Sequence, residues 1–144
     1  MCAGLEFGIL NLEFSGGMNI FGIGVDVVEV ERIAAAIERQ GEAFVKRVFT
    51  DGERAYCEGQ KYPEQHYAAR FAVKEAVAKA FGTGIGRDLS LLDMDIIRLE
   101  SGRPELVLSG GGKEFAGRQG ITGVKISLSH TGSCAVGNAV AIIP

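Results

Sequence analysis

The stretch PEQHYAARFAVKEAVAKAFG, residues Pro63–Gly82, predicts the longest helix of the chain. Proline suits the first turn of a helix, because its missing N–H would find no partner there. The alanine-rich run that follows has a high helix propensity, and Gly82 is a typical residue to end it. The sequence therefore predicts one helix over Pro63–Phe81.

The two sides of this helix differ in chemistry. At about 100° per residue, one side gathers small apolar residues that we expect to pack: Ala72, Val73, Ala76, Val77 and Ala80. The other side carries Lys74, Glu75 and Lys79. Glu75 and Lys79 are four residues apart, so their side chains are neighbours. Most such pairs are exposed ion pairs worth about 0.3–0.5 kcal/mol.

Shorter elements flank the helix on both sides. Upstream, a helical pattern starts near Val28 and stops at Gly41, and a capping box at Thr50 opens a helix that ends near Gly59. Downstream, Gly110–Gly112 precedes a short helix to about Gln119. The other expected elements are a short helix, Glu42–Val48, and the strands Asn19–Val25, Asp95–Glu100, Glu105–Ser109, Lys125–His130 and Cys134–Ile143. Because helices concentrate in the first half and strands in the second, the expected class is α+β.

Composition narrows the possible functions. The chain has 144 residues, 47% of them hydrophobic, which indicates one globular domain. A net charge of −3 argues against nucleic acid as the main partner. Three widely spaced cysteines indicate reduced thiols and a cytoplasmic protein. No apolar stretch is long enough to cross a bilayer, so we expect no membrane association.

The first seventeen residues, Met1–Gly17, differ from the rest. They lack the basic start of a secretion signal, and Ser15-Gly16-Gly17 is typical of a flexible joint. We expect residues 1–17 to form an N-terminal extension outside the fold, and residues 18–144 to form the domain.

Asp26 lies in an apolar run, FGIGVDVVEVERI, Phe21–Ile33. A carboxylate buried there without a partner is costly, and the usual solutions are a cation, a proton or a metal ion. Gly22-Ile23-Gly24 just before it is no dinucleotide-binding fingerprint, because the third glycine is missing. The partner of Asp26 must come from elsewhere in the chain.

Other candidate residues have both a structural and a functional interpretation. Gly84 and Gly86 follow the long helix and can expose N–H groups to an anion, although two glycines alone are a weak signal. His130 ends an alternating strand, where a histidine is more often structural. Arg32 and Arg39 are seven residues apart and share a helix face, which is either a solvated basic face or a binding surface.

Taken together, three motifs resemble the holo-acyl-carrier-protein synthases, the small 4'-phosphopantetheinyl transferases of fatty acid biosynthesis. The motifs are GIGVDVVEVERI, RFAVKEAVAKAFGTGIG and SLSHTGSCAVGNAV, in the family's order and at similar separations. The turn Gly102-Arg103-Pro104 resembles the family's GKP turn, with arginine in place of lysine. The resemblance covers about Met18 to Ile143. The N-terminal extension and the glycine run Gly110–Gly112 depart from it.

The resemblance implies a fold and a reaction. Helices would pack on a small, mostly antiparallel sheet, and three subunits would assemble with active sites at their interfaces. The enzyme would transfer the phosphopantetheine arm of coenzyme A to a serine of apo-acyl carrier protein, with Mg²⁺, and release adenosine 3',5'-bisphosphate. Two open alternatives are a non-catalytic module that binds carrier protein or coenzyme A, and a metal-dependent hydrolase of coenzyme A.

The resemblance also assigns roles to residues. Asp26 and Glu75 match the metal ligands, and Mg²⁺ usually takes one or two carboxylates with phosphate oxygens and waters. Glu75 and Lys79 are the expected catalytic residues. Arg32 and Arg39 would meet the carrier protein. The expected coenzyme A contacts are Arg70, Lys79, Gly82, Gly84, His130 and Thr131.

Overall fold

The structure, a computed structural model, describes residues 17–144. The predicted extension, residues 1–17, lies outside the described residues except for Gly17. No helix in the described part combines the length and the hydropathy needed to cross a membrane.

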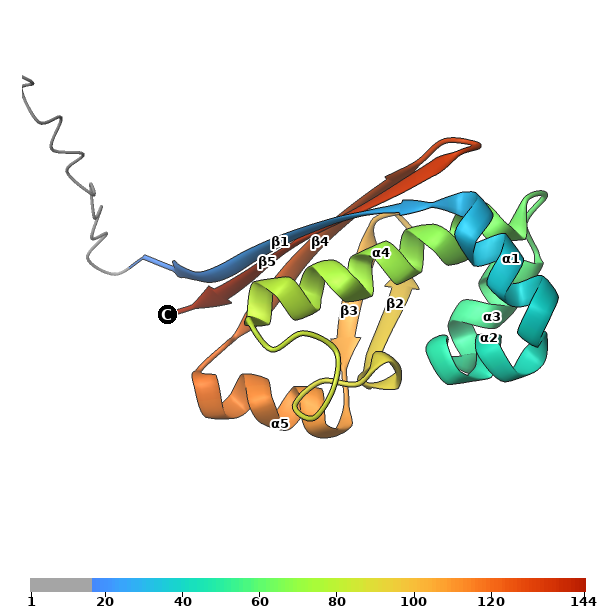
Figure 1. The fold of residues 1–144 in the computed structure, drawn as a ribbon. Helices are drawn as coiled ribbons and strands as arrows, with labels where there is room; N and C mark the ends of the chain where they lie inside the picture. The colour runs from blue at the N-terminus through green and yellow to red at the C-terminus, as the bar shows by residue number, and fades with distance from the viewer. Residues whose placement is uncertain (1–16) are drawn as a thin grey trace, which may run out of the picture.

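The long helix α4 (Pro63–Phe81) lies along one face of a three-stranded antiparallel sheet (Figure 1). The sheet has the strand order β1 (Asn19–Glu29), β5 (Cys134–Ile143) and β4 (Gly123–His130). The predicted bounds of α4 are confirmed, with Pro63 in the first turn and Gly82 as a left-handed cap. This packing of one helix on one sheet positions every site described below.

Glycines let the two strands approach the backbone of α4. A Cβ atom at Gly24 would lie 1.8 Å from the carbonyl oxygen of Ala76, and one at Gly137 would lie 2.3 Å from the amide nitrogen of Val73. Ala76 and Val73 are fully buried beneath these strands. The glycines around Ile23 therefore serve close strand–helix packing, which a side chain would block.

Strand β1 is longer than predicted. Its pairing with β5 continues to Glu29, which lies opposite Cys134, so helix α1 (Val30–Gln40) begins two residues after Val28. A valine-rich segment suits either structure locally, and the ladder to β5 decides between them. The predicted stop of α1 at Gly41 is confirmed, with φ at 59°.

Two short helices, α2 (Glu42–Val48) and α3 (Asp51–Glu58), lie beside α1 at one end of α4 (Figure 1). The capping box at the start of α3 is confirmed. The Glu53 amide donates to Thr50 Oγ1 over 3.2 Å, and the Thr50 amide donates to Glu53 Oε1 over 2.9 Å. Together, α1, α2 and α3 cover part of α4.

A second sheet and a last helix cover the other part of α4. After the 3-10 turn η1 (Leu91–Asp93), strands β2 (Met94–Arg98) and β3 (Pro104–Leu108) form an antiparallel pair. Strands β2 and β3 each begin one residue before the predicted start, and β4 begins two residues before its predicted start. Helix α5 (Gly110–Gln119) contains the three glycines that were expected to precede it. The predicted α+β class is confirmed.

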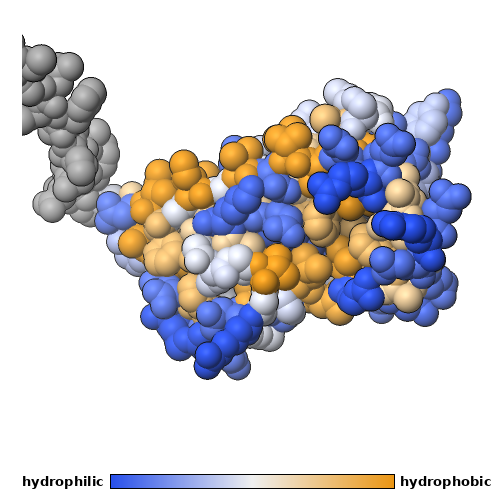
Figure 2. Space-filling model, viewed as in Figure 1, coloured by the Kyte–Doolittle hydropathy of each residue, from blue (hydrophilic) through white to orange (hydrophobic). Residues whose placement is uncertain are grey.

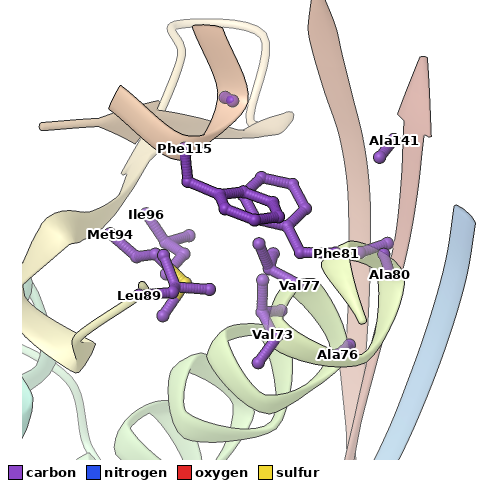
Figure 3. Packing of buried hydrophobic residues seen from close by; sticks show 13 residues of the cluster. Val73, Ala76, Val77, Ala80, Phe81, Leu89, Met94, Ile96, Phe115 and Ala141 are labelled. Atoms are coloured by element: carbon purple, nitrogen blue, oxygen red, sulfur yellow. The ribbon is translucent and has the colours of Figure 1, made fainter. Parts of the chain in front are cut away.

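The main apolar core lies between α4, β2 and α5. Figure 3 shows Phe81 and Phe115 stacked on one another, and their ring centroids lie 5.5 Å apart. Leu89 and Met94 are fully buried and belong to the same cluster. Burial of such side chains contributes about 1.5–3 kcal/mol each, so this core holds α5 and β2 against α4.

The expectation for Lys74 was wrong. The helical wheel placed it on the polar side with Glu75 and Lys79, yet its side chain is fully buried. Its Nζ donates to Glu53 Oε1 over 2.7 Å and to the backbone carbonyls of Val48 and Leu91. The reason is that α2, α3 and η1 cover this side of α4, and a wheel of α4 alone cannot show that cover.

Candidate functional site

The packing of β1 on α4 brings Asp26, Glu75 and Lys79 together. Side chains alternate along a strand, so Asp26 shares the α4 side of β1 with Gly24. Val25 and Val27 point to the opposite face, where they are 54% and 62% exposed. The side chain of Asp26 is 19% exposed, so the apolar run around it does not bury the carboxylate completely.

Lys79 is the partner of Asp26. Its Nζ donates to Asp26 Oδ1 over 3.0 Å and to the Val25 carbonyl oxygen over 2.9 Å. Among the described residues, Lys79 forms its ion pair with Asp26 and not with Glu75. The lysine side chain is 54% exposed, so it can move from Asp26 to another anion without unpacking the helix.

Glu75 lies close enough to this pair to feel its charges. Burial and the neighbouring Asp26 carboxylate raise the pKa of Glu75, and Lys79 opposes the rise. A raised pKa means that ionised Glu75 is disfavoured, so the charge of Lys79 alone does not offset burial and the repulsion from Asp26. A divalent cation beside Asp26 and Glu75 would supply it.

The chemistry of the donors suits magnesium better than zinc. Within residues 17–144, no group of three or more His, Cys, Asp or Glu side chains lies together as a metal site. Two carboxylates are what Mg²⁺ commonly takes from a protein when phosphate oxygens and waters fill its other positions. Asp26 and Glu75 therefore fit a metal that arrives with a phosphate-bearing substrate.

A groove of about 530 Å³ runs from these acids along α1. Arg32 and Arg39 both line it, so the prediction that they share a face of α1 is confirmed. Both side chains are exposed. The rest of the lining is apolar, and its residues are Val27, Val28, Ile33, Ala35, Ala36, Phe44 and Phe71. The groove thus brings two acids and two arginines into one mostly apolar lining.

Arg70 and His130 meet at a different place, a cavity of about 60 Å³. Arg70 is only 4% exposed. Its guanidinium carbon lies 4.2 Å from the ring centroid of Tyr56, and its Nε has no hydrogen-bond partner. His130 Nδ1 lies 3.1 Å from Gln65 Oε1. A buried guanidinium with an unused donor indicates a site for an anion.

Among the other lining residues of this cavity, three polar side chains were missed from the sequence: Tyr56, His66 and Arg98. One signal was available, because His66 lies four residues before Arg70 and hence on the same side of α4. Tyr56 and Arg98 come from α3 and β2, and no local pattern links them to Arg70.

The cavity and the groove lie on different sides of α4. Glu75 follows Arg70 by five residues, which places the two side chains about 140° apart around the helix. The two sites share no lining residue. Thr131 continues from His130 into the β4–β5 turn, where its Oγ1 accepts from the amides of Ser133 and Cys134.

The glycines after α4 have their amides occupied. Gly82 and Gly84 both adopt positive φ, at 75° and 64°, and their N–H groups donate to the carbonyl oxygens of Lys79 and Ala78. The Gly86 amide also donates within the chain, to the carbonyl oxygen of Leu89 over 2.9 Å. The prediction that Gly84 and Gly86 expose their N–H groups to an anion is therefore not supported. Their lack of side chains still leaves the end of α4 open beside Lys79.

Comparison with known proteins identifies the family. The model of the 4'-phosphopantetheinyl transferase superfamily matches residues 22–133. Holo-acyl-carrier-protein synthase from Ruminiclostridium cellulolyticum is 48% identical over 82% of this chain and 89% of its own length. Among solved structures, the synthase from Neisseria meningitidis is 34% identical, with a TM-score of 0.80, and the match covers 85% of this chain and 98% of that one.

A second solved relative was determined with a ligand. The Helicobacter pylori holo-acyl-carrier-protein synthase in complex with coenzyme A is 32% identical, with a TM-score of 0.75 over 83% of this chain and 98% of that one. The chain therefore belongs to the 4'-phosphopantetheinyl transferase superfamily, and within it to the holo-acyl-carrier-protein synthases. The family expected from the three sequence motifs is confirmed.

Proposed function

We propose that this protein transfers the 4'-phosphopantetheine group of coenzyme A to a serine of apo-acyl carrier protein. The observation that carries the proposal is that Asp26 and Glu75 line one groove together with Arg32 and Arg39, while Lys79 forms an ion pair with Asp26. Two acids and a lysine suit a pyrophosphate with its cation, and the two arginines suit an acidic protein. Membership of the synthase family supports the same reaction.

The direct test is to mix the protein with apo-acyl carrier protein, coenzyme A and Mg²⁺ and to record the mass of the carrier. A gain of one phosphopantetheine arm is expected, together with adenosine 3',5'-bisphosphate. An unchanged carrier with consumption of coenzyme A would indicate a hydrolase instead. An unchanged carrier and intact coenzyme A would indicate a binding module.

Asp26 and Glu75 are the residues that would hold Mg²⁺. When bound, the ion supplies positive charge to the pyrophosphate and relieves the repulsion between the two acids. Reduced cysteines, with Cys57 buried and Cys134 half-buried and both free, support a cytoplasmic setting. Fatty acid biosynthesis is the pathway that such a transfer serves.

Lys79 would stabilise the leaving phosphate. The serine hydroxyl of the carrier attacks the phosphorus nearer the pantetheine, and the bond to the adenosine-side phosphate breaks, so negative charge grows on that phosphate. Phosphoryl transfer depends mainly on positioning and charge stabilisation. Lys79 is exposed and already bound to an anion, Asp26 Oδ1, which is the environment such a role needs. We propose Glu75, whose pKa is raised by burial and by Asp26, as the group that accepts the serine proton.

Replacing Lys79 by Ala is expected to lower kcat about 10²-fold or more, the scale of one lost charge-stabilising donor. The affinity for coenzyme A should weaken much less. Steady-state kinetics with coenzyme A and carrier varied separately would measure both. The matched control is Lys61→Ala, since Lys61 is also exposed but does not line the groove. A Lys79 variant that changed only coenzyme A affinity would make Lys79 a binding residue.

Arg70, His130 and Thr131 are proposed to bind another part of coenzyme A. The unpartnered Nε of Arg70 and the cavity beside His130 support a phosphate there. Gly82 and Gly84 would border the ligand through their open surface, because their amides donate within the chain.

We propose a homotrimer with active sites shared between subunits. The small residues of β5 belong to the core of the single chain, since Ala135, Ala139 and Ala141 are fully buried. The apolar face that remains is the other side of the sheet, where Ile23, Val25 and Val27 are exposed. Figure 2 shows apolar side chains along the strand side of the molecule.

Sharing of sites agrees with the separation between the groove and the Arg70 cavity on different sides of α4. A neighbouring subunit would bring its cavity to the groove, and one coenzyme A would then contact both. Each site forms its contacts within a single subunit. The proposal of a trimer with shared sites is therefore supported by the family and by the exposed apolar face.

Arg32 and Arg39 are proposed to meet an acidic surface of the carrier protein. Reversing both charges, Arg32→Glu with Arg39→Glu, is expected to raise the KM for the carrier about tenfold or more, while the KM for coenzyme A changes little. Charges at an interface rim mainly set association and its salt dependence. The measurement is KM for each substrate at two salt concentrations. Equal changes in both KM values would contradict the assignment.

A further inference from the structure

We propose that binding of a phosphate monoester in the Arg70–His130 cavity takes up a proton on His66, so that affinity for such ligands rises as pH falls from about 8.5 to about 6.5. The inference rests on the proposed function, because coenzyme A and adenosine 3',5'-bisphosphate carry this group. His66 was not among the residues expected from the sequence, and the contacts around it carry the argument.

His66 stands between two aromatic neighbours from other elements. Its ring centroid lies 4.8 Å from that of His130 on β4 and 5.7 Å from that of Tyr56 on α3, with both pairs close to edge-on. His130 is held by Gln65 Oε1 on the other side of its ring. The two imidazoles therefore face the same cavity from α4 and β4.

Positive charge dominates the lining of the cavity. Arg70 reaches it from α4 and Arg98 from β2, where its Nη1 donates to the hydroxyl of Tyr56. No carboxylate lines the cavity, and Glu64 is the acid that acts on His66 from its own helix. With the Arg70 Nε still unpartnered, this environment favours a doubly charged anion.

The state of His66 then depends on the ligand. Burial, His130, Arg70 and Arg98 together lower the pKa of His66, so without a ligand its neutral form is favoured at neutral pH. A phosphate dianion reverses the local field and favours the imidazolium, which donates a charge-assisted hydrogen bond to it. The pKa of His66 is therefore higher in the complex than in the free protein.

Linkage gives the sign of the pH dependence. A group whose pKa rises on binding takes up a proton with the ligand, so the ligand binds better at lower pH. The gain in affinity is complete below the pKa of His66 in the free protein. It is lost as the pH rises through the pKa of His66 in the complex. One proton sets an upper limit of about tenfold in affinity per pH unit. Below about pH 6 the phosphate itself gains a proton, which bounds the useful range.

The test is calorimetric titration of the full chain with adenosine 3',5'-bisphosphate from pH 6.5 to 8.5, in two buffers of different ionisation enthalpy. Uptake of protons and a weakening of affinity about threefold to tenfold towards pH 8.5 are expected. His66→Gln should remove most of the uptake and of the slope, with affinity near that of the unaltered protein at pH 8.5. Dephospho-coenzyme A, which lacks the monoester, should show little proton uptake.

His66 and His130 are the two histidines of the sequence, so imidazole NMR signals report directly on the site. The His66 signal should titrate at higher pH in the complex than in the free protein, and this reading needs no variant. Binding without proton uptake, or uptake that persists in His66→Gln, would overturn the inference while the transferase assay still succeeds. No binding at any pH, together with no transfer to the carrier, would overturn the proposed function as well.

Discussion

Asp26→Ala is expected to abolish magnesium-dependent turnover and to leave the fold intact. The change removes one of the two carboxylates that line the groove and takes away the anion to which Lys79 is bound. The backbone of β1 should hold, because the ladder to β5 runs on both sides of Asp26 from Asn19 to Glu29. Turnover at varied Mg²⁺ concentration and a thermal unfolding curve would measure the two effects.

The matched control for Asp26 is Asp51→Ala. Asp51 is 95% exposed and pairs with Arg54 on α3, away from the groove, so its loss should leave turnover nearly unchanged. Asp26→Asn removes the charge but keeps the shape of the side chain, and it too should lose magnesium-dependent turnover. Activity in Asp26→Ala with an unaltered metal requirement would show that the metal ligands lie elsewhere.

Lys74→Met is expected to destabilise the protein by about 3–5 kcal/mol, the usual cost of removing one partner of a buried ion pair. Methionine keeps most of the volume, so a cavity is not the cause. The loss leaves Glu53 buried and charged, and Glu53 also accepts the amide of Ile96 on β2 over 3.0 Å. The carbonyls of Val48 and Leu91 lose their donor as well. Denaturant unfolding with a two-state fit would measure the free energy.

Lys46→Ala is the control for Lys74. Lys46 pairs with Glu42 on the exposed face of α2, and such surface pairs contribute about 0.2–1 kcal/mol at most. The double change Lys74→Met with Glu53→Gln should recover part of the stability, because it removes the unpaired charge. Equal and small losses in Lys74→Met and Lys46→Ala would contradict the buried ion pair.

Features that depend on neighbouring residues in the chain were predicted well. The bounds of α4, its proline start and its Gly82 cap follow from backbone rules that act within a turn, and so does the capping box of Thr50 and Glu53. The α+β class was also predictable, since helical and alternating patterns separate along the chain. The same is true of Arg32 and Arg39, which helical spacing puts on one face.

Boundaries and environments that depend on distant segments were not predicted. The β1–α1 boundary moved to Glu29 because β5 pairs with the valines there. Lys74 went from the expected polar side to the interior because α2, α3 and η1 cover it. Asp26 proved partly exposed, at 19%, and its valine neighbours face away from α4. In each case a partner far along the sequence sets the burial, and periodicity in one segment carries no information about that partner.

By itself, the sequence determined the family, the positions of the helices and the identities of the acids, lysine and arginines that we assign to the reaction, because these reside in local patterns and in motifs at given separations. The tertiary structure alone decided which of them meet. Gly24 and Gly137 let β1 and β5 reach the backbone of α4, and that contact sets Asp26 against Lys79, while the register of β4 brings His130 to His66 and Arg70. Close packing selects such partners through the shape of both surfaces, and each surface is built from segments that lie far apart in the chain.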